Sequence, residues 1–470
     1  MKKLLSTIVL TMSLSTTASA AELLIKLASP ISTEKTVKTW NSAGLNTKQV
    51  MPQWISVQGN IQASQFQSFL ANGSVLHVQP NYKLNVYSNP SLVKAKQNAA
   101  LMKYIESLPI DVAAAKPADN PAIPDAPANT TGNDPLFSKQ WGMVDNGLEN
   151  ALKINAGQKI IVAVIDTGVD YTHEDLLPNM WRNKNEIPNN GIDDDKNGFI
   201  DDVVGWDFLD NDNKPYDLAS TNIGDLMNGA NPGHGTHCAG NVGAKGGNGK
   251  GISGMNPNAQ IMAMRFIGDK GGTTTGAIGA IRYAVDNGAK VLSNSWGSEG
   301  EDPAEAADNL ALQEAIQYAM DKNVLFIAAA ANSGNDNDGD PKKAAFPASY
   351  PHENIISVAA IDSANGLASF SNYGAKSVDI GAPGVKIFST TVGNHYSDTV
   401  IELLGANWDG TSMACPHVAG AAALYWSAHP EKNWKQVKDA ILSSAKPIPS
   451  LTGKTLTGAK LSVENLMKVN

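Results

Sequence analysis

Residues 162–170 read VAVIDTGVD, and this stretch decides the fold. An uninterrupted apolar run ends in Asp166, and a glycine follows at position 168. Short runs of this kind are typical of strands buried on both faces, as in a parallel sheet covered by helices. A carboxylate at the end of such a strand is costly to bury unless it is hydrogen-bonded. We therefore expect Asp166 to have a polar partner at the edge of a sheet.

The same pattern recurs through the C-terminal part of the chain. Apolar runs occur at residues 160–165, 261–266, 291–294, 324–330 and 355–360, and helical patterns at 275–286 and 304–321 separate several of them. Strands that alternate with helices predict an α/β domain, residues 131–470, with a mostly parallel central sheet and helices on both faces. In such sheets, active residues gather at the carboxyl ends of the strands.

The N-terminal part is organised differently. Residues 1–20 combine two lysines, an apolar stretch and the sequence Ala18-Ser19-Ala20, which are the three parts of a secretory signal peptide. Residues 21–88 predict a small α+β domain of βαββαβ order, with strands at 23–27, 54–57 and 75–78 and helices at 32–43 and 63–70. Residues 89–130 predict a helix over 91–108 and then a linker at 109–128, rich in proline and alanine. We expect a secreted protein, extracellular or periplasmic.

The composition limits the partners of the chain. Hydrophobic residues make up 42% of it and charged residues 17%, and its net charge is −9. No apolar run after the signal peptide is long enough to span a bilayer. Ten aspartates and two lysines fall within residues 191–230, which argues against nucleic acid as a partner and indicates a bound cation. Cys238 and Cys415 are the only cysteines, so the chain is not a disulfide scaffold, and we expect a monomer without a membrane partner.

Two further segments carry chemically active residues. GHGTHCAG at 233–240 places His234 where a helix can begin, and DGTSMACPHVAG at 409–420 places Ser412 at the start of a helix of small residues. A serine there lies beside unpaired backbone N–H groups and the positive end of the helix dipole, which suits an oxyanion. Taken singly, each residue also has an ordinary structural explanation, as a turn-forming Asp, a loop His or a helix-capping Ser.

In the order Asp, His, Ser, the three segments together resemble the signature motifs of the subtilase family almost letter for letter, and its thermitase-like members in particular. The resemblance implies a subtilisin-like fold and a serine endopeptidase. Ser412 would be the nucleophile, His234 the general base, and Asp166 the group that orients the imidazole. Asn332, in FIAAAANSGN at 326–335, aligns with the oxyanion-hole amide of the family. Ala331 departs from the pattern, because many relatives have glycine there.

The resemblance also assigns the substrate cleft. Ser295, Trp296 and Gly297 resemble one substrate-binding strand, and Gly271 and Gly272 resemble the opposite strand. Two such edges bind an extended peptide through main-chain hydrogen bonds. Ala345, beside FPAS at 346–349, resembles the base of the S1 pocket, which holds the side chain before the scissile bond. This part of the sequence places no charged residue in S1, so we expect broad specificity with an apolar or aromatic P1 residue.

Calcium is the cofactor that the resemblance implies. Asp175 and Asn248 match the tight site of the family, and Asp134 resembles the N-terminal ligand of thermitase-like members. GIDDDKNGFIDD at 191–202 also has the D-x-D-x-N-G spacing of a calcium loop, but it lacks the closing Glu. Its candidate ligands are Asp193, Asp195, Asn197, Asp201 and Asp202. The alternative is a solvated acidic loop.

Residues 21–88 resemble the inhibitory prodomain of the family, whose removal activates the enzyme. The segment at 89–130 is longer than in simpler relatives, so the sequence leaves the maturation site open. The expected partners are protein or peptide substrates and the chain's own prodomain. Two alternatives remain on the same fold, an inactive peptide-binding protein and a peptide ligase. The first would lack a catalytic residue, and none is lost here, but the ligase uses the same acyl-enzyme and stays open.

Overall fold

The computed structural model describes residues 22–42, 44–58, 75–97, 133–154, 158–298 and 307–470. The expected signal peptide, the expected helix at 63–70 and the linker at 109–128 lie outside these residues.

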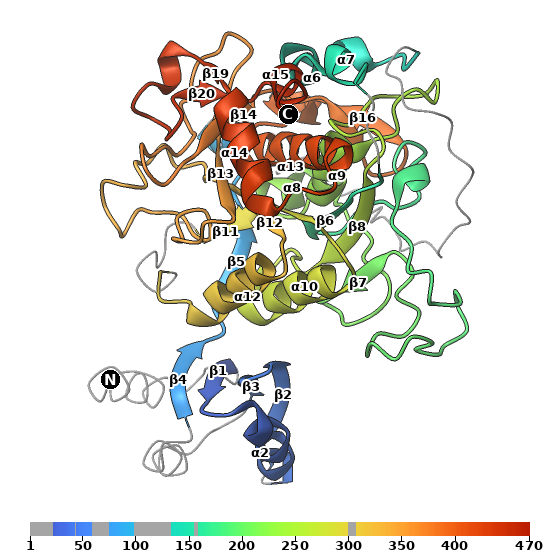
Figure 1. The fold of residues 1–470 in the computed structure, drawn as a ribbon, viewed down its shortest axis with the longest axis vertical. Coiled ribbons are helices and arrows are strands. Elements are labelled where there is room, and N and C mark those ends of the chain that lie inside the picture. The colour runs from blue at the N-terminus through green and yellow to red at the C-terminus, as the bar shows by residue number, and fades with distance from the viewer. Residues whose placement is uncertain (1–21, 43, 59–74, 98–132, 155–157, 299–306) are drawn as a thin grey trace.

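A nine-stranded sheet forms the centre of the large C-terminal unit (Figure 1). Its strand order is β19-β20-β14-β13-β12-β10-β6-β8-β7, and every pair is parallel except β19 with β20. This confirms the predicted parallel sheet. The strands are β6 (Ile161–Asp166), β7 (Gly205–Asp207), β8 (Gln260–Arg265), β10 (Val291–Asn294), β12 (Leu325–Ala329), β13 (Ile355–Ile361), β14 (Ile380–Pro383), β19 (Lys446–Pro447) and β20 (Ala459–Lys460).

Helices cover both faces of this sheet because alternate strand residues point to opposite sides. Val162 and Val164 of β6 belong to one apolar cluster with α9 (His234–Gly243), α13 (Thr411–Ala428) and α14 (Trp434–Ser444). Ala163 and Ile165 belong to a second cluster with α10 (Thr274–Asp286) and α12 (Leu310–Asp321), on the other face (Figure 1). Both faces of the strand are therefore buried, as the apolar run predicts.

A smaller antiparallel sheet belongs to the N-terminal unit, with strand order β2-β3-β1-β4. Its elements are β1 (Glu22–Leu27), α2 (Pro30–Ser42), β2 (Asn46–Met51), β3 (Trp54–Gln58) and β4 (Val75–Pro80). The unit packs on the first turns of α10 and α12 (Figure 1). Gln79 accepts from Ala311 N at 3.0 Å, Asn81 accepts from Thr275 N at 2.9 Å, and Trp54 donates to Glu314 at 2.8 Å.

Between the two units, the chain runs along the carboxyl edge of the large sheet. There β5 (Lys83–Val86) pairs on one side with β9 (Gly272–Thr273) and on the other with β11 (Trp296–Gly297). The next element, α4 (Pro90–Lys96), packs on α8 (Ile223–Met227) and on the hairpin of β17 (Thr399–Ile401) and β18 (Ala406–Asn407). Of the helix expected over 91–108, the structure describes only the part up to Gln97.

The remaining described elements are short. They are α6 (Trp141–Asp145), α7 (Leu148–Ala151), α15 (Val463–Leu466), β15 (Ser389–Thr391), β16 (His395–Ser397) and the 3₁₀ turns η1 (Phe137–Lys139), η2 (Leu177–Asn179), η3 (Glu402–Leu404) and η4 (Pro449–Leu451). Among the described helices, none combines the length and the apolar character needed to cross a membrane.

Candidate active site

Asp166 and His234 meet at the carboxyl end of β6. His234 opens α9, and its Nδ1 lies 2.7 Å from Asp166 Oδ1, where Thr167 N also donates at 2.7 Å. Both side chains are buried. The other ring nitrogen, His234 Nε2, is buried without a hydrogen-bond partner among the described residues. It is therefore available to take up a proton.

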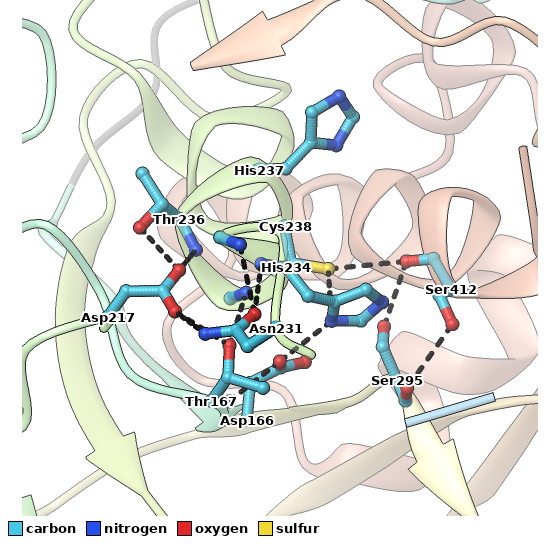
Figure 2. A network of polar contacts seen from close by, with 12 residues as sticks. Asp166, Thr167, Asp217, Asn231, His234, Thr236, His237, Cys238, Ser295 and Ser412 are labelled. Carbon is cyan, nitrogen blue, oxygen red and sulfur yellow. Dashed lines mark hydrogen bonds and ion pairs between the residues drawn. The ribbon is translucent and has the colours of Figure 1, made fainter. Parts of the chain in front are cut away.

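Ser412 lies in the first turn of α13 and is buried beside this histidine (Figure 2). Its hydroxyl donates to the Ser295 carbonyl at 3.2 Å rather than to His234. In return, Ser295 Oγ donates to the Ser412 carbonyl at 2.9 Å. A hydrogen bond to His234 Nε2 would require the Ser412 hydroxyl to rotate away from the Ser295 carbonyl.

Asn332 is held with its amide nitrogen facing the cleft. Its Oδ1 accepts from the backbone N and the hydroxyl of Thr411, both at 2.9 Å, and its Nδ2 donates to the Ser88 carbonyl at 3.1 Å. The preceding Ala331 is fully buried and has φ +86°. An L-residue in this left-handed region costs roughly 1 kcal/mol, which glycine would avoid.

The predicted substrate residues surround the segment from Lys83 to Ser88. Val86 pairs with Trp296 and Asn85 with Gly297, while Leu84 pairs with Gly272. Continuing this register puts Tyr87 opposite Ser295.

Close approach explains the glycines in the two cleft strands. A Cβ on Gly297 would lie 2.1 Å from the Tyr87 hydroxyl, and one on Gly271 would lie 2.2 Å from Asn85 Oδ1. Tyr87 itself is buried in one apolar cluster with Ala331 and Ala345. Both strands, and the predicted S1 residues, thus contact the chain's own N-terminal segment.

Behind His234 lies a polar network that the sequence analysis missed (Figure 2). Asp217 is fully buried and accepts four hydrogen bonds. The donors are Thr167 Oγ1 at 2.9 Å, Asn231 Nδ2 at 2.6 Å, Thr236 N at 2.8 Å and Thr236 Oγ1 at 2.7 Å. Burial, with a contribution from nearby Asp166, raises the pKa of the Asp217 carboxyl to about 6.

This network fixes the start of α9, where the N-cap residue Gly233 has no side chain to offer. Asn231 Oδ1 accepts from the backbone N of Gly233 at 2.9 Å and of His234 at 3.0 Å. Thr167 Oγ1 accepts from Gly235 N at 2.9 Å. The first N–H groups of the helix are therefore satisfied by Asn231 and Thr167, which Asp217 orients, and by Asp217 itself, which accepts from Thr236 N. Asp217 acts on His234 as a positioning residue.

Both cysteines are free and buried. Cys238 Sγ lies 3.9 Å from His234 Nδ1, on the same face of α9. Burial raises the pKa of the Cys238 thiol well above its ordinary value, so the thiol stays protonated. It is not a nucleophile in this arrangement.

Comparison with known proteins agrees with this geometry. The model of the subtilase family matches residues 157–464. The chain belongs to the subtilase family. It is 36% identical to the thermophilic serine proteinase of Bacillus sp. (strain AK1) over 368 residues, 78% of this chain and 73% of that protein. It is also 36% identical to thermitase of Thermoactinomyces vulgaris over 320 residues, 68% of this chain and 92% of thermitase.

Among solved structures, the subtilase is similar to fervidolysin from Fervidobacterium pennivorans, described as a keratinolytic enzyme related to subtilisin. The TM-score is 0.65 at 25% identity, and the match covers 96% of this chain and 61% of that one. These matches confirm the resemblance stated from the motifs, the subtilisin-like fold and the prediction of a serine endopeptidase.

Three candidate calcium ligands of this subtilase lie around one loop. Asp134 accepts from Gly247 N through both carboxylate oxygens, at 3.0 and 2.8 Å. Asp175 accepts from Asn248 Nδ2 at 2.8 Å and from Ile252 N at 2.8 Å. Burial raises the pKa of Asp134 to about 6 and also raises that of Asp175, and the charge of Asp175 adds to the shift at Asp134. Asp134 and Asp175 are buried carboxylates, which suit a Ca²⁺ ion, whereas Asn248 is half-buried and turns its Nδ2 rather than its Oδ1 toward Asp175.

A second group of candidate calcium ligands lies at the acidic loop, residues 191–202. It includes a residue that the sequence analysis missed. One carboxylate oxygen each of Glu186, Asp193 and Asp195 lies within 4.8 Å of the others. Glu186 precedes the loop and accepts from the backbone N of Asp194, Asp195 and Asp201. It thus supplies a Glu that the loop itself lacks.

The other three predicted ligands of the loop, Asn197, Asp201 and Asp202, do not belong to this group of carboxylates. Asn197 Nδ2 donates to Asp195 at 3.2 Å and to Asp202 at 2.9 Å. Asp202 is buried and also accepts from the Tyr283 hydroxyl at 2.5 Å. Asp201 accepts from the backbone N of Asn190 and Gly191 at the start of the loop. The structure therefore brings Asp193 and Asp195 together with Glu186, whereas Asn197 turns its amide nitrogen to Asp195 and Asp202, and Asp201 and Asp202 have other partners.

We expect Asn332→Leu to lower kcat by about 10²–10³ with little change in KM, because loss of one oxyanion donor costs that much in subtilisin itself. Steady-state kinetics on a peptide with an aromatic P1 residue gives both constants, and the thermal midpoint checks the fold. A kcat near that of the wild type would mean that another group stabilises the oxyanion.

We expect Asp217→Asn to change how stability depends on pH. The fold raises the pKa of Asp217 from 3.8 to about 6, so the ionised carboxylate is disfavoured in the folded state. The associated stability is present below about pH 4 and is lost as the pH rises through 6. Relative to the Asn variant, the wild type should lose up to about 3 kcal/mol of unfolding free energy between pH 4 and pH 7.

Urea unfolding at both pH values measures this difference, with Ser412→Ala in both proteins to prevent autolysis. Equal pH dependence in the two proteins would mean that the fold does not raise the pKa of Asp217.

Proposed function

We propose that this subtilase is a secreted endopeptidase that cleaves peptide bonds with Asp166, His234 and Ser412, and that its N-terminal unit blocks the cleft until it is removed. One observation carries the proposal. The segment from Lys83 to Ser88 lies between β9 and β11 as an extended peptide substrate would, with Tyr87 against the S1 residues. The domain boundaries follow the sequence analysis: a signal peptide at 1–20, a prodomain at 21–88, a connecting segment at 89–130 and the catalytic domain at 131–470.

The mechanism follows from the positions of the polar atoms. When the Ser412 hydroxyl rotates to His234 Nε2, the imidazole takes its proton and Oγ attacks the scissile carbonyl. Asp166 Oδ1 accepts from Nδ1–H, which fixes the tautomer and stabilises the imidazolium. Asn332 Nδ2 and the Ser412 backbone N–H donate to the oxyanion. His234 then gives its proton to the leaving amine, and water hydrolyses the acyl-enzyme by the reverse route.

The bound segment also supports a specificity. Tyr87 in S1 favours aromatic and large apolar P1 residues. Leu84 belongs to an apolar cluster with Phe266 and Ile267, which favours an apolar P4 residue. Main-chain pairing contributes the rest of the binding and is largely independent of sequence, so specificity is broad.

Strand register and the burial of Tyr87 support the Tyr87–Ser88 bond as the maturation site. The Asn332 contact falls one residue further on, at the Ser88 carbonyl. We give more weight to the register, because the pairing of β5 with both edge strands and the packing of Tyr87 against S1 are independent and agree. The Asn332 contact and the Ser412 hydroxyl orientation then belong to a resting arrangement that precedes attack.

Calcium would stabilise the catalytic domain through two groups of oxygen donors. Asp134, Asp175 and Asn248 would join the segment before α6 to the loop after α9. Glu186, Asp193 and Asp195 would close the acidic loop between β6 and α9. A bound Ca²⁺ supplies positive charge between carboxylates that otherwise repel one another.

A peptide ligase is the alternative activity on this fold. Ligation and hydrolysis share the acyl-enzyme and differ in whether an amine or water attacks it. Product analysis with an added peptide amine separates them, because a ligase gives mainly the transpeptidated product.

Replacement of the nucleophile tests the proposed function. Ser412→Ala should abolish hydrolysis of casein and labelling by a fluorophosphonate, and the precursor should keep its N-terminal unit. The wild-type protein should yield a fragment whose N-terminal sequence begins at Ser88. Strong labelling of the variant would refute the triad, and a first fragment that begins at Asn89 would move the scissile bond to Ser88–Asn89.

Removal of calcium should lower the inactivation temperature, and Asp193→Ala with Asp195→Ala should reproduce part of that loss. A ligand that binds only the folded state adds roughly 2.7 kcal/mol at a hundredfold excess over its Kd. Thermal midpoints with calcium and with EDTA measure the effect.

Asp194→Ala is the matched control, because that carboxylate accepts instead from Ile187 N and Asn190 Nδ2. If the double variant responds to calcium as fully as Asp194→Ala does, the loop is not a calcium site.

A further inference from the structure

The chain beyond the Tyr87–Ser88 bond does not leave the cleft but folds onto it as α4. Leu92 of α4 is only 8% exposed. It packs in an apolar cluster with Leu226 and Met227 of α8 and with Ile401 and Ala406 of the β17–β18 hairpin. We call the surface formed by these last four residues the leaving-group groove, because it lies on the side of the cleft that receives residues after the scissile bond.

Polar contacts fix α4 in this groove. Asn89 Oδ1 caps the helix by accepting from Leu92 N at 3.1 Å, and Asn89 Nδ2 donates to the Asn407 carbonyl at 3.0 Å. Ser91 donates to Asp409, which lies in the segment that leads to Ser412. These contacts of Asn89 and Ser91, both just before Leu92, thus hold the helix to β18 and to the segment that leads to Ser412.

The groove is continuous with the active site. One pocket is lined in part by His234, Ser412, Trp408, Leu226 and Leu92. The α8 wall of the groove also lies in the segment between Asp217 and Asn231, two members of the network behind His234. An apolar side chain five residues beyond Tyr87 can therefore be bound while the scissile bond lies at Ser412.

We propose that the leaving-group groove is a binding site for an apolar side chain carried five residues after the scissile bond, and that α4 occupies it both before and after the Tyr87–Ser88 bond is cut. The inference rests on the proposed function. Hydrolysis adds one water, which gives Tyr87 a carboxylate and Ser88 an amino group. The N-terminal unit is then no longer covalently attached, whereas α4 remains joined to the catalytic domain through the chain that follows it.

This difference in attachment divides activation into two steps. A tethered segment binds at an effective concentration in the millimolar range, so α4 rebinds much faster than a free peptide would. The first cut allows the N-terminal unit to dissociate, and its dissociation frees the half of the cleft that binds residues before the scissile bond. The other half becomes free only after a second cut on the C-terminal side of Gln97.

Docking of α4 is tested first by hydrogen exchange, on the full precursor with Ser412→Ala so that no cleavage occurs. Leu92→Asp should speed exchange of the amides of residues 92–97 by at least about tenfold, because burying one leucine is worth about 10- to 100-fold in an equilibrium constant. Val93→Asp is the matched control, because Val93 lies on the same helix and is 46% exposed. Met227→Asp changes the groove instead of the helix and should act like Leu92→Asp. Equal exchange in all four proteins overturns the proposal.

The two-step activation is tested with two substrates during maturation of the active precursor. One is a chromogenic anilide with tyrosine at P1 and no residue beyond the scissile bond. The other is a quenched peptide that extends six residues beyond it. In the wild type, hydrolysis of the anilide should begin once the N-terminus Ser88 has appeared and the cut N-terminal unit has dissociated, and hydrolysis of the long peptide should lag behind. With Leu92→Asp the lag should disappear, whereas with Val93→Asp it should remain.

The outcomes separate this inference from the function on which it rests. If neither substrate is hydrolysed, the proposed function fails, and hydrogen exchange still decides whether α4 docks. If the long peptide and the anilide are hydrolysed together while sequencing still finds Ser88 as the N-terminus, the groove does not retain α4 and the inference is wrong.

Discussion

The hydrogen bond between Asp166 and His234 joins the end of a buried strand to the start of a helix, and most of the surrounding structure serves to hold it. Two buried polar groups are costly unless each is fully partnered. Asp166 can lie at the carboxyl edge only because its strand is covered on both faces. His234 can face it only because α9 begins at that point, and the helix lacks a cap of its own. Asp217 supplies that cap from another segment: it accepts directly from Thr236 N, and it orients Thr167 and Asn231, which accept from the preceding N–H groups.

The same edge of the sheet also receives the contacts of the N-terminal unit. The small unit inserts Gln79 at the first turn of α12 and Asn81 at that of α10, where backbone N–H groups otherwise lack partners. From there β5 enters the cleft, and α4 closes its far side. Three successive parts of the chain therefore use three kinds of contact. The small unit caps two helices, β5 pairs with two strands, and α4 buries one leucine.

The sequence predicts those features that depend on local pattern. Strands buried on both faces leave uninterrupted apolar runs, so five of the nine central strands could be located from residues alone. By contrast, β14 is a four-residue strand that contains glycine and proline, and its pattern is indistinguishable from a loop. Asp217 and Glu186 were missed for another reason. Both lie in or beside a stretch crowded with carboxylates, and only the fold buries Asp217 and Glu186 while it leaves Asp194 half-buried. The position of α4 depends likewise on α8 and the β17–β18 hairpin, which are far from it in sequence.

Strand pairing in the cleft limits which segments of a folded protein the enzyme can bind. Once β5 is gone, β9 and β11 form two short edges that accept one extended strand between them. A folded protein keeps its strands and helices paired internally, so it can supply that strand only when a stretch of several residues opens by local unfolding. When such opening is fast compared with cleavage, the rate of digestion follows the equilibrium population of the open form. The rate at which this enzyme digests a folded protein would then depend more on the stability of that protein's least stable segment than on the residues at its surface.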